Sequence, residues 1–281
     1  MTDMPTGSAM VAGVTGWPVK HSLSPRLHGY WLKKYGVDGI YAPFPIQADS
    51  FDKAVRGLQA AGVRGLNVTV PHKLAAYALA DELDPAARMI GAVNTLVFHD
   101  DGSIEGRNTD APGFLANLRY YHVDVSVGPV LMFGAGGAAR AATKALLDAG
   151  APEVRLVNRN AGNANELVRL AADDRLMYVG NSLENRALSD VSLVVNTTSL
   201  GMSGHGSIEL GMTDLPAHAV VHDIVYTPLQ TDLLARAGSA GLKTVDGLGM
   251  LLHQAAPAFE AFYGRRPDVD EGLRSYLLEM L

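Results

Sequence analysis

VLMFGAGGAAR, residues 130–140, is the stretch of this sequence that decides its fold. The apolar run Val130–Phe133 predicts a strand, and the residues after the glycines predict a helix. Gly134 permits a tight turn between them, and Gly136 lets the backbone approach a pyrophosphate at the helix N-terminus. Ala139 takes the third small position of the dinucleotide-binding pattern G-x-G-x-x-G/A. The competing interpretation is a tight strand–helix connection that binds no ligand.

Strands and helices alternate along the chain that follows this turn. Helices are expected at residues 138–149 and near residues 165–171. Further strands are expected at residues 154–157, 176–179, 193–196, 220–225 and 242–245. Such alternation predicts a doubly wound parallel sheet of the Rossmann type. We expect this domain to span residues 111–246.

The end of the expected strand at residues 154–157 indicates the cofactor. NAD-binding proteins usually carry Asp or Glu at this point, which holds the ribose hydroxyls of the adenosine. This chain carries Asn158-Arg159-Asn160 instead. The guanidinium of Arg159 can pair with a 2′-phosphate, and the absent carboxylate removes a repulsion that NADP would meet. NADP is therefore the expected cofactor; the alternative is that Arg159 is a solvated surface arginine.

The first 110 residues predict a separate α/β region. Strands are expected at residues 10–14, 40–46 and 65–70, and a hairpin joins residues 93–98 to 103–106. Ser24 is the expected N-cap of a helix, with Pro25 at its first position and Gly36 at its end. Further helices are expected after Ser50 and at Asp84-Pro85.

The bulk composition indicates a globular protein that acts on a small molecule. Of 281 residues, 48% are hydrophobic and 19% are charged, and the formal net charge is −6. An acidic surface repels phosphate backbones, which argues against nucleic acid as a partner. Cysteine is absent, which excludes disulfides and thiolate metal sites. No secretory signal or apolar run of membrane-spanning length is visible, so a cytoplasmic location is expected, with no membrane partner.

Three polar clusters lie at the ends of elements in the first 110 residues. Ser22 and Ser24 stand at a helix start, where hydroxyls and free N–H groups suit a carboxylate. Alternation places Asn67 and Thr69 on one face of a strand, with Lys73 just beyond its end. The alternatives are a plain helix cap at Ser24 and a solvated lysine. The remaining polar residues are Asn94 and, at the start of an expected linker helix, Asn108-Thr109-Asp110.

Seven motifs follow one another in order between about residue 13 and residue 265. They are Gly16-Trp-Pro-Val-Lys-His-Ser22-Leu-Ser24-Pro25, Asn67-Val-Thr-Val-Pro-His-Lys73, Gly91-Ala-Val-Asn94-Thr95, Gly106-Arg-Asn-Thr-Asp110, Asn196-Thr-Thr-Ser-Leu-Gly-Met202, Asp223-Ile-Val-Tyr226-Thr-Pro228 and Asp246-Gly247-Leu-Gly-Met250-Leu-Leu-His-Gln254. Together they resemble the shikimate dehydrogenase family. That family reduces 3-dehydroshikimate to shikimate with NADPH, a step toward chorismate and the aromatic amino acids. The resemblance implies an oxidoreductase that acts on a CH–OH group with NADP.

The resemblance also implies an architecture and a role for each motif residue. Residues 1–110 and 247–281 would form a substrate domain with a mixed sheet, beside the Rossmann domain. Lys73 and Asp110 would form the catalytic pair. Ser22 and Ser24 would hold the substrate carboxylate. The ring hydroxyls would be bound by Asn67, Thr69, Asn94, Asp110 and Gln254, with Tyr226 nearby, and NADP would be lined by Gly134, Ala135, Gly136, Gly137, Ala138, Asn158, Arg159, Ile224 and Gly247.

The chemistry needs a group that exchanges a proton with the reacting oxygen. Hydride transfer leaves or requires a proton there. Lys73 as an ammonium can protonate the forming alkoxide during ketone reduction, and as a free amine it can accept the proton in reverse. Asp110 would orient this lysine and hold a substrate hydroxyl. His72, which directly precedes Lys73, is expected only to pack.

Two features concern the choice of cofactor and substrate. The family often carries a second basic residue about four positions after the Asn-Arg pair, and this chain has Asn163 there. The nearest alternative is a quinate/shikimate dehydrogenase that uses NAD, which often has Thr in place of the second serine. Ser24 and Arg159 favour the shikimate enzyme over this alternative.

Two alternatives come from other classes of protein. A non-catalytic NADP-binding sensor of the same fold should have lost Lys73 or Asp110, and both are present. A zinc site would need His218 and His222 on a helix, but their surroundings predict a strand, so no metal is expected. The expected assembly is a monomer or a homodimer.

Overall fold

The computed structural model describes residues 4–181 and 188–281. The chain divides into two compact units. Unit 1 comprises the residues up to Thr109 together with Gln254–Met280, and unit 2 comprises Asp110–His253 with Leu281. Within the described ranges, no helix is long and apolar enough to cross a membrane.

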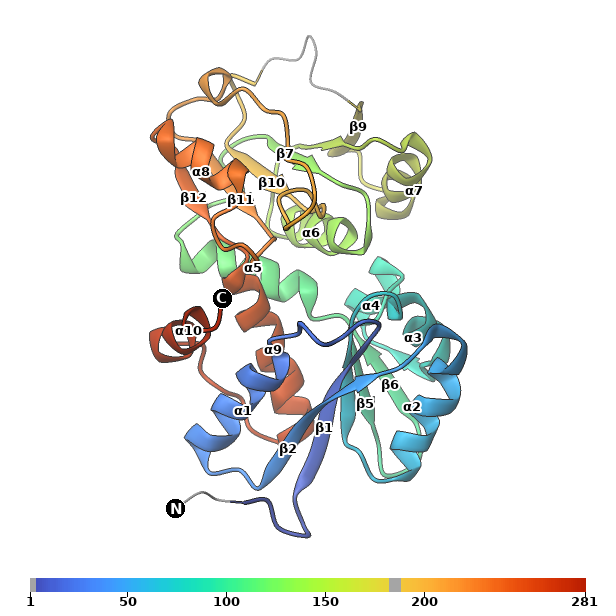
Figure 1. The fold of residues 1–281 in the computed structure, drawn as a ribbon. Coiled ribbons are helices and arrows are strands. Elements are labelled where there is room, and N and C mark those ends of the chain that lie inside the picture. Colours follow the sequence, from blue (N-terminus) through green and yellow to red (C-terminus); the bar gives the residue numbers. More distant parts are fainter. Residues whose placement is uncertain (1–3, 182–187) are drawn as a thin grey trace. The chain divides into compact units, whose positions relative to one another are not determined.

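Unit 1 is built on a six-stranded sheet in the order β2-β1-β3-β5-β6-β4 (Figure 1). β1 pairs in parallel with β2 and β3, whereas β5 is antiparallel to both β3 and β6. The mixed sheet and the hairpin are thereby confirmed, and the two-residue β4 is an addition to the expected strands. The strands are β1 Met10–Gly16, β2 Gly39–Pro45, β3 Gly65–Val68, β4 Glu82–Leu83, β5 Thr95–Phe98 and β6 Ile104–Arg107.

Helices cover both faces of this sheet. α2, α3 and α4 pack on the face to which Leu66 and Val68 belong. On the other face, a Cβ at Gly65 would collide with Phe262 of α9. Because strand residues alternate between faces, Asn67 lies on the same face as Gly65. The helices are α1 Ser24–Tyr35, α2 Phe51–Ala60, α3 Lys73–Leu79, α4 Pro85–Ile90, α9 Leu248–Tyr263, whose residues from Gln254 onward belong to unit 1, and α10 Glu271–Leu278, with a 3-10 turn at Ala48–Ser50.

The start of α1 differs from the expectation. Ser24 is the first helical residue and not the N-cap, and Pro25 is therefore the second. Leu23 takes the cap position because its backbone is already nearly helical, at φ −82° and ψ −9°. The hydroxyl of Ser22 accepts a hydrogen bond from the N–H of Ser24 over 3.3 Å. Gly36 ends the helix in the left-handed conformation, as expected.

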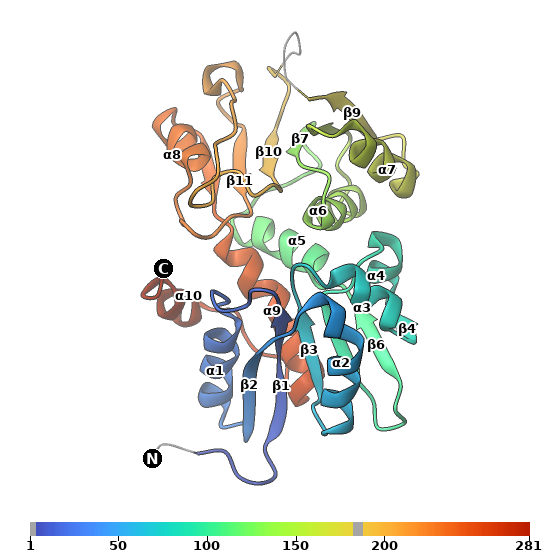
Figure 2. The same cartoon turned by 45° about the vertical axis from the view of Figure 1, so that its right-hand side comes forward.

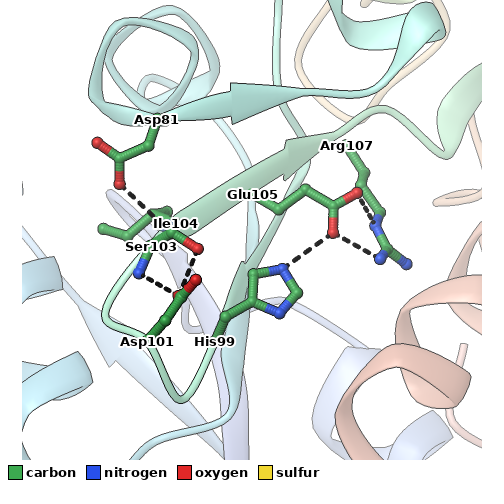
Figure 3. A network of polar contacts seen from close by, with 7 residues as sticks. All are labelled: Asp81, His99, Asp101, Ser103, Ile104, Glu105 and Arg107. Atoms are coloured by element: carbon green, nitrogen blue, oxygen red, sulfur yellow. Dashed lines mark hydrogen bonds and ion pairs between the residues drawn. The ribbon is translucent and has the colours of Figure 1, made fainter.

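A polar network holds the β5–β6 hairpin (Figure 3). The N–H and hydroxyl of Ser103 both donate to Oδ1 of Asp101, over 2.9 and 2.7 Å. Along β6, Arg107 donates to the carboxylate of Glu105 over 2.6 Å, and His99 contacts the same carboxylate at 3.2 Å. The guanidinium of Arg107 is the largest cause that lowers the pKa of Glu105. The hairpin thus fixes the strand that leads directly into Asn108-Thr109-Asp110.

Unit 2 contains a parallel sheet in the order β12-β11-β10-β7-β8-β9, with every pair of neighbours parallel. This confirms the Rossmann-type domain. The chain runs outward from β7 to β9, then returns to the other side of β7 and runs outward again. The carboxyl ends of β7 and β10 therefore form the switch point at which such sheets bind ligands. The strands are β7 Val130–Phe133, β8 Val154–Val157, β9 Leu176–Gly180, β10 Leu193–Asn196, β11 Val220–Asp223 and β12 Lys243–Val245.

The helices of unit 2 begin slightly earlier than expected. α6 starts at Gly137. α7 starts at Ala161, because the side chain of Asn160 accepts from the N–H of Asn163 over 3.1 Å and caps the helix. Figure 2 shows α7 beside β9. The helices are α5 Asp110–Tyr120, α6 Gly137–Asp148, α7 Ala161–Ala171 and α8 Asp232–Ser239, with a 3-10 turn at Met212–Asp214.

Candidate active site and cofactor site

The glycine-rich turn after β7 has the backbone that sequence reasoning expected. Gly134 adopts a φ of +108°, a conformation that favours glycine. A Cβ there would also collide with the side chain of Thr197 at the end of β10. Ala135 is buried. The turn after β7 therefore lies in close contact with Thr197, which follows the neighbouring strand β10.

The residues that start α6 leave their backbone open. A Cβ added at Gly136 or Gly137 would have nothing within 4 Å. Ala138 is half-buried, and Ala139 is fully buried, as the small third position of the pattern requires. The exposed N–H groups at this helix N-terminus fit a pyrophosphate.

A pocket of roughly 730 Å³ lies at the carboxyl ends of β7, β8 and β10. Arg159 is exposed in it, and the amide of Asn158 donates to the carbonyl of Asn160 over 2.7 Å. Its size and position suit the adenosine end of a dinucleotide, with a guanidinium for a 2′-phosphate. The residues that define it include Phe133, Asn158, Arg159, Asn163, Thr198 and Glu209.

Ile224 and Gly247 lie together at the ends of β11 and β12. A Cβ at Gly247 would collide with the carbonyl group of Ile224, so glycine permits the two segments to touch. Tyr226, two residues further on, is half-buried, and burial raises the pKa of its hydroxyl. All the residues expected to line NADP thus follow carboxyl ends of strands in one sheet.

A buried network beneath these loops was not identified from the sequence. The amide of Asn196 donates to Oδ1 of Asp223 over 2.9 Å, and Thr231 donates to Oδ2 of Asp223 over 2.7 Å. Oδ1 of Asn196 accepts from the N–H of Thr198 over 2.9 Å. Burial raises the pKa of Asp223. The network holds the loops after β10 and β11. Asn196 and Asp223 are the first residues of the motifs at residues 196–202 and 223–228.

In unit 1, the two serines expected to hold a carboxylate lie at the start of α1. Ser24 is buried and Ser22 is half-buried. Tyr41 on β2 is also buried, and its hydroxyl lies beside the hydroxyl of Ser24. Burial raises the pKa of Tyr41 well above its ordinary value, and the Ser24 hydroxyl opposes this rise.

Three predicted substrate residues of unit 1 belong to one chain of hydrogen bonds. Tyr41 donates to Oδ1 of Asn67 over 2.6 Å, and Nδ2 of Asn67 donates to Oγ1 of Thr95 over 3.0 Å. Thr95 donates to Oδ1 of Asn94 over 3.0 Å. Nδ2 of Asn94 donates to Oγ1 of Thr109 over 3.0 Å, and Thr109 contacts Oε1 of Gln254 at 3.4 Å. The sequence alone assigned no role to Tyr41, Thr95 or Thr109, although Thr95 lies in the motif of residues 91–95 and Thr109 in that of residues 106–110.

Lys73 is the first residue of α3 and is half-buried. Thr69, half-buried after the end of β3, accepts from the N–H of His72 through its carbonyl. His72 is buried, bonds to the carbonyl of Ile46 over 2.7 Å and stacks on Phe51 at 4.6 Å. It packs, as expected.

Asp110 is the first residue of α5 and is buried, with 8% of its surface exposed. It belongs to unit 2, whereas Lys73 belongs to unit 1.

The two histidines considered for a zinc site, His218 and His222, lie in different environments. His222 is buried on β11, its Nδ1 lies 2.9 Å from the carbonyl oxygen of Val245, and burial lowers its pKa to about 4. His218 is exposed. Within residues 4–181 and 188–281, no group of three His, Asp or Glu residues gathers to hold a metal.

Two family models match the chain. The shikimate dehydrogenase substrate binding domain matches residues 14–96, and the shikimate 5′-dehydrogenase C-terminal domain matches residues 247–274. The shikimate dehydrogenase (NADP(+)) of Paramagnetospirillum magneticum is 52% identical over 277 residues, which covers 97% of this chain and 99% of that protein. This chain belongs to the shikimate dehydrogenase (NADP(+)) family.

Solved structures agree with this membership. Shikimate dehydrogenase from Thermus thermophilus, in complex with NADP(H) and shikimate, is 36% identical with a TM-score of 0.86, over 97% of this chain and all of that one. The fold also extends to quinate dehydrogenase from Corynebacterium glutamicum in complex with NAD, at 28% identity and a TM-score of 0.88, over 96% of this chain and 99% of that one. The higher identities lie with the shikimate dehydrogenases, and the chain is an NADP-dependent oxidoreductase of the shikimate pathway.

Proposed function

We propose that this member of the shikimate dehydrogenase family reversibly reduces 3-dehydroshikimate to shikimate, with residues 1–110 and 247–281 binding the substrate and residues 111–246 binding NADP. The observation that carries the proposal is the hydrogen-bond chain that joins Asn67, Asn94 and Gln254 in unit 1. Amides linked in this way hold fixed orientations, as the recognition of ring hydroxyls requires.

The substrate carboxylate binds at the start of α1 in this proposal. Ser22 and Ser24 supply hydroxyls at the positive end of a helix of 12 residues. Asn67, Thr69, Asn94 and Gln254 bind the ring hydroxyls. Asp110 and Tyr226 are also assigned to the substrate in this proposal.

Lys73 exchanges the proton with the reacting oxygen. In the direction of ketone reduction, its ammonium gives a proton to the forming alkoxide, and in the direction of oxidation the free amine takes it back. Asp110 is the carboxylate of the proposed catalytic pair and accepts a hydrogen bond from a substrate hydroxyl. Proton transfer of this kind usually accounts for a rate factor of about 10² to 10⁴.

The second unit supplies the cofactor site. When bound, NADPH supplies the hydride, and NADP⁺ accepts it in the reverse direction. The segment 134–138 holds the pyrophosphate on open backbone N–H groups. Asn158 and Arg159 bind the adenosine end, while Ile224 and Gly247 line the site at the ends of β11 and β12.

Initial rates in a matrix of substrates and cofactors test the proposal. Shikimate and quinate are each assayed with NADP⁺ and NAD⁺ on the purified protein. The expected result is the highest kcat/KM with shikimate and NADP⁺. A preference for quinate with NAD⁺ would overturn the assignment.

The cytoplasmic location and the assembly as a monomer or homodimer stay predictions. Analytical ultracentrifugation of the purified protein measures the assembly directly.

A further inference from the structure

Tyr41 combines a buried ring with a hydroxyl that contacts the proposed substrate site. Its ring stacks on the imidazole of His28, with centroids 3.8 Å apart and planes 9° apart. Both nitrogens of His28 are buried without a hydrogen-bond partner among the described residues. This histidine therefore packs against the phenol and does not compete for its hydroxyl. The ring is fixed in place, and its hydroxyl is directed to Asn67.

The direction of each hydrogen bond in the chain can be deduced from one backbone group. The N–H of Thr109 can only donate, and it lies 2.9 Å from Asn94, so the Asn94 atom there is the oxygen. The single hydroxyl proton of Thr95 must then go to the same oxygen. Thr95 consequently accepts from the nitrogen of Asn67.

The oxygen of Asn67 must therefore face Tyr41, which donates to it. One N–H of Asn67 is used by Thr95, and the other has only a long contact of 3.5 Å to the carbonyl of Asn94. This second N–H is the group that a ligand hydroxyl can engage. The orientation of the amide, and hence whether Asn67 presents a donor or an acceptor to a ligand, depends on Thr95 and Tyr41 together.

We propose that Tyr41 is a positioning residue for the substrate: together with Thr95 it fixes the Asn67 amide with an N–H toward the ligand. The inference rests on the proposed function, because it concerns the same site. Without the phenol hydroxyl, the oxygen of Asn67 loses its donor, and of the two hydrogen bonds that orient the amide the one to Thr95 remains, so the amide is held less firmly.

Tyr41→Phe tests this inference on the intact enzyme. We expect KM for shikimate to rise about tenfold, as for the loss of one buried hydrogen bond, with kcat and KM for NADP⁺ within twofold of wild type. Tyr263→Phe is the matched control, because Tyr263 is also a buried tyrosine of unit 1, and its hydroxyl donates to the carbonyl of Ile40 over 2.9 Å. It should lose a similar amount of thermal stability without a change in KM for shikimate.

A double-mutant cycle separates positioning from general loss of structure. If Tyr41 acts through Asn67, then Tyr41→Phe should change KM for shikimate less than twofold in an Asn67→Ala background. Equal effects of Tyr41→Phe in both backgrounds, or a KM within twofold of wild type for the single variant, would overturn the inference. A wild-type enzyme inactive on shikimate with NADP⁺ would instead overturn the proposed function.

If Tyr41→Phe does not fold, a second pair of variants tests the same hydrogen-bond chain. Thr95→Val removes the next link of the chain at nearly constant volume, and Thr95→Ser retains the hydroxyl. We expect the valine variant to raise KM for shikimate about tenfold and the serine variant to restore it. Equal KM values for the two variants would contradict the proposal.

Discussion

A Cβ placed on Gly134 would lie 2.6 Å from Oγ1 of Thr197. Thr197 cannot easily move aside, because its hydroxyl donates to the carbonyl of Phe133 over 2.5 Å. The glycine at this position is therefore required by the close contact with Thr197 as well as by its own backbone angle. Gly136, two residues later, has ordinary dihedrals and open space. Replacing Gly134 should therefore affect stability, whereas replacing Gly136 should affect cofactor binding.

Gly134→Ala is expected to destabilise the protein by about 1–3 kcal/mol, the usual effect of overpacking, with further cost from its positive φ. Gly136→Ala should leave stability nearly unchanged and weaken NADP⁺ binding about tenfold, because its methyl group occupies the space proposed for the pyrophosphate. Urea unfolding and calorimetric titration with NADP⁺ measure the two effects. Equal loss of stability in both variants would contradict the distinction.

Arg159→Ala is expected to lower kcat/KM for NADP⁺ by about tenfold to a hundredfold, the effect of losing a charge-assisted hydrogen bond. The value for NAD⁺ should stay within twofold, because NAD⁺ has no 2′-phosphate. Arg169→Ala is the control, since this arginine is exposed on the same unit in the last turn of α7. A parallel loss with both cofactors would show that Arg159 does not recognise the phosphate.

Lys73→Ala is expected to lower kcat by about 10² to 10⁴-fold. Calorimetric binding of NADP⁺ should be unchanged, because the lysine lies in unit 1 and the cofactor site is assigned to unit 2. Lys53→Ala, at an exposed position of α2, serves as the control. Turnover near the wild-type rate in the Lys73 variant would remove this residue from the acid–base role.

His28→Phe is expected to make unit 1 less sensitive to acid. Burial lowers the pKa of His28 from 6.5 to about 3, so the unfolded chain binds the proton first as the pH falls. The stability that depends on neutral imidazole is present above about pH 6.5 and is lost as the pH falls toward about 3. Between about pH 8 and pH 5 this loss amounts to roughly 2 kcal/mol.

The measurement is urea unfolding at both pH values, followed by the fluorescence of buried Trp31. Because Trp17 is about half exposed, at 48%, a Trp17→Phe background isolates the signal of Trp31. The variant should lose less stability than wild type on acidification. An unchanged difference between the two pH values would show that His28 does not contribute to the pH dependence.

Much of the fold could be predicted because its signals are local. The apolar runs at Val130–Phe133 and Leu193–Asn196 are bounded by glycine and polar residues, and both strands end where the pattern places them. The end of β3 was less predictable. The apolar pattern extends to Val70, but the strand stops at Val68, and the carbonyl of Val70 instead accepts from the N–H of Trp17. A contact with a loop far away in sequence decides that boundary.

Some residues of the candidate site could likewise be predicted from the sequence, and others could not. Ser22, Asn67 and Asn94 stood out because each lies in a motif at the end of an element. Tyr41 did not, because it is an ordinary aromatic residue in a strand, and only its pairing across the sheet brings its hydroxyl to Asn67. A single sequence carries no signal for such a cross-strand contact.

The order of the two units along the chain has a consequence for biogenesis. Unit 2 is a nearly uninterrupted stretch, so a nascent chain can complete it soon after His253 leaves the ribosome. Unit 1 needs Gln254–Met280, so its first strands must wait for the last helices to be synthesised. Until then, the face of the sheet that Phe262 will cover stays available to chaperones or to aggregation.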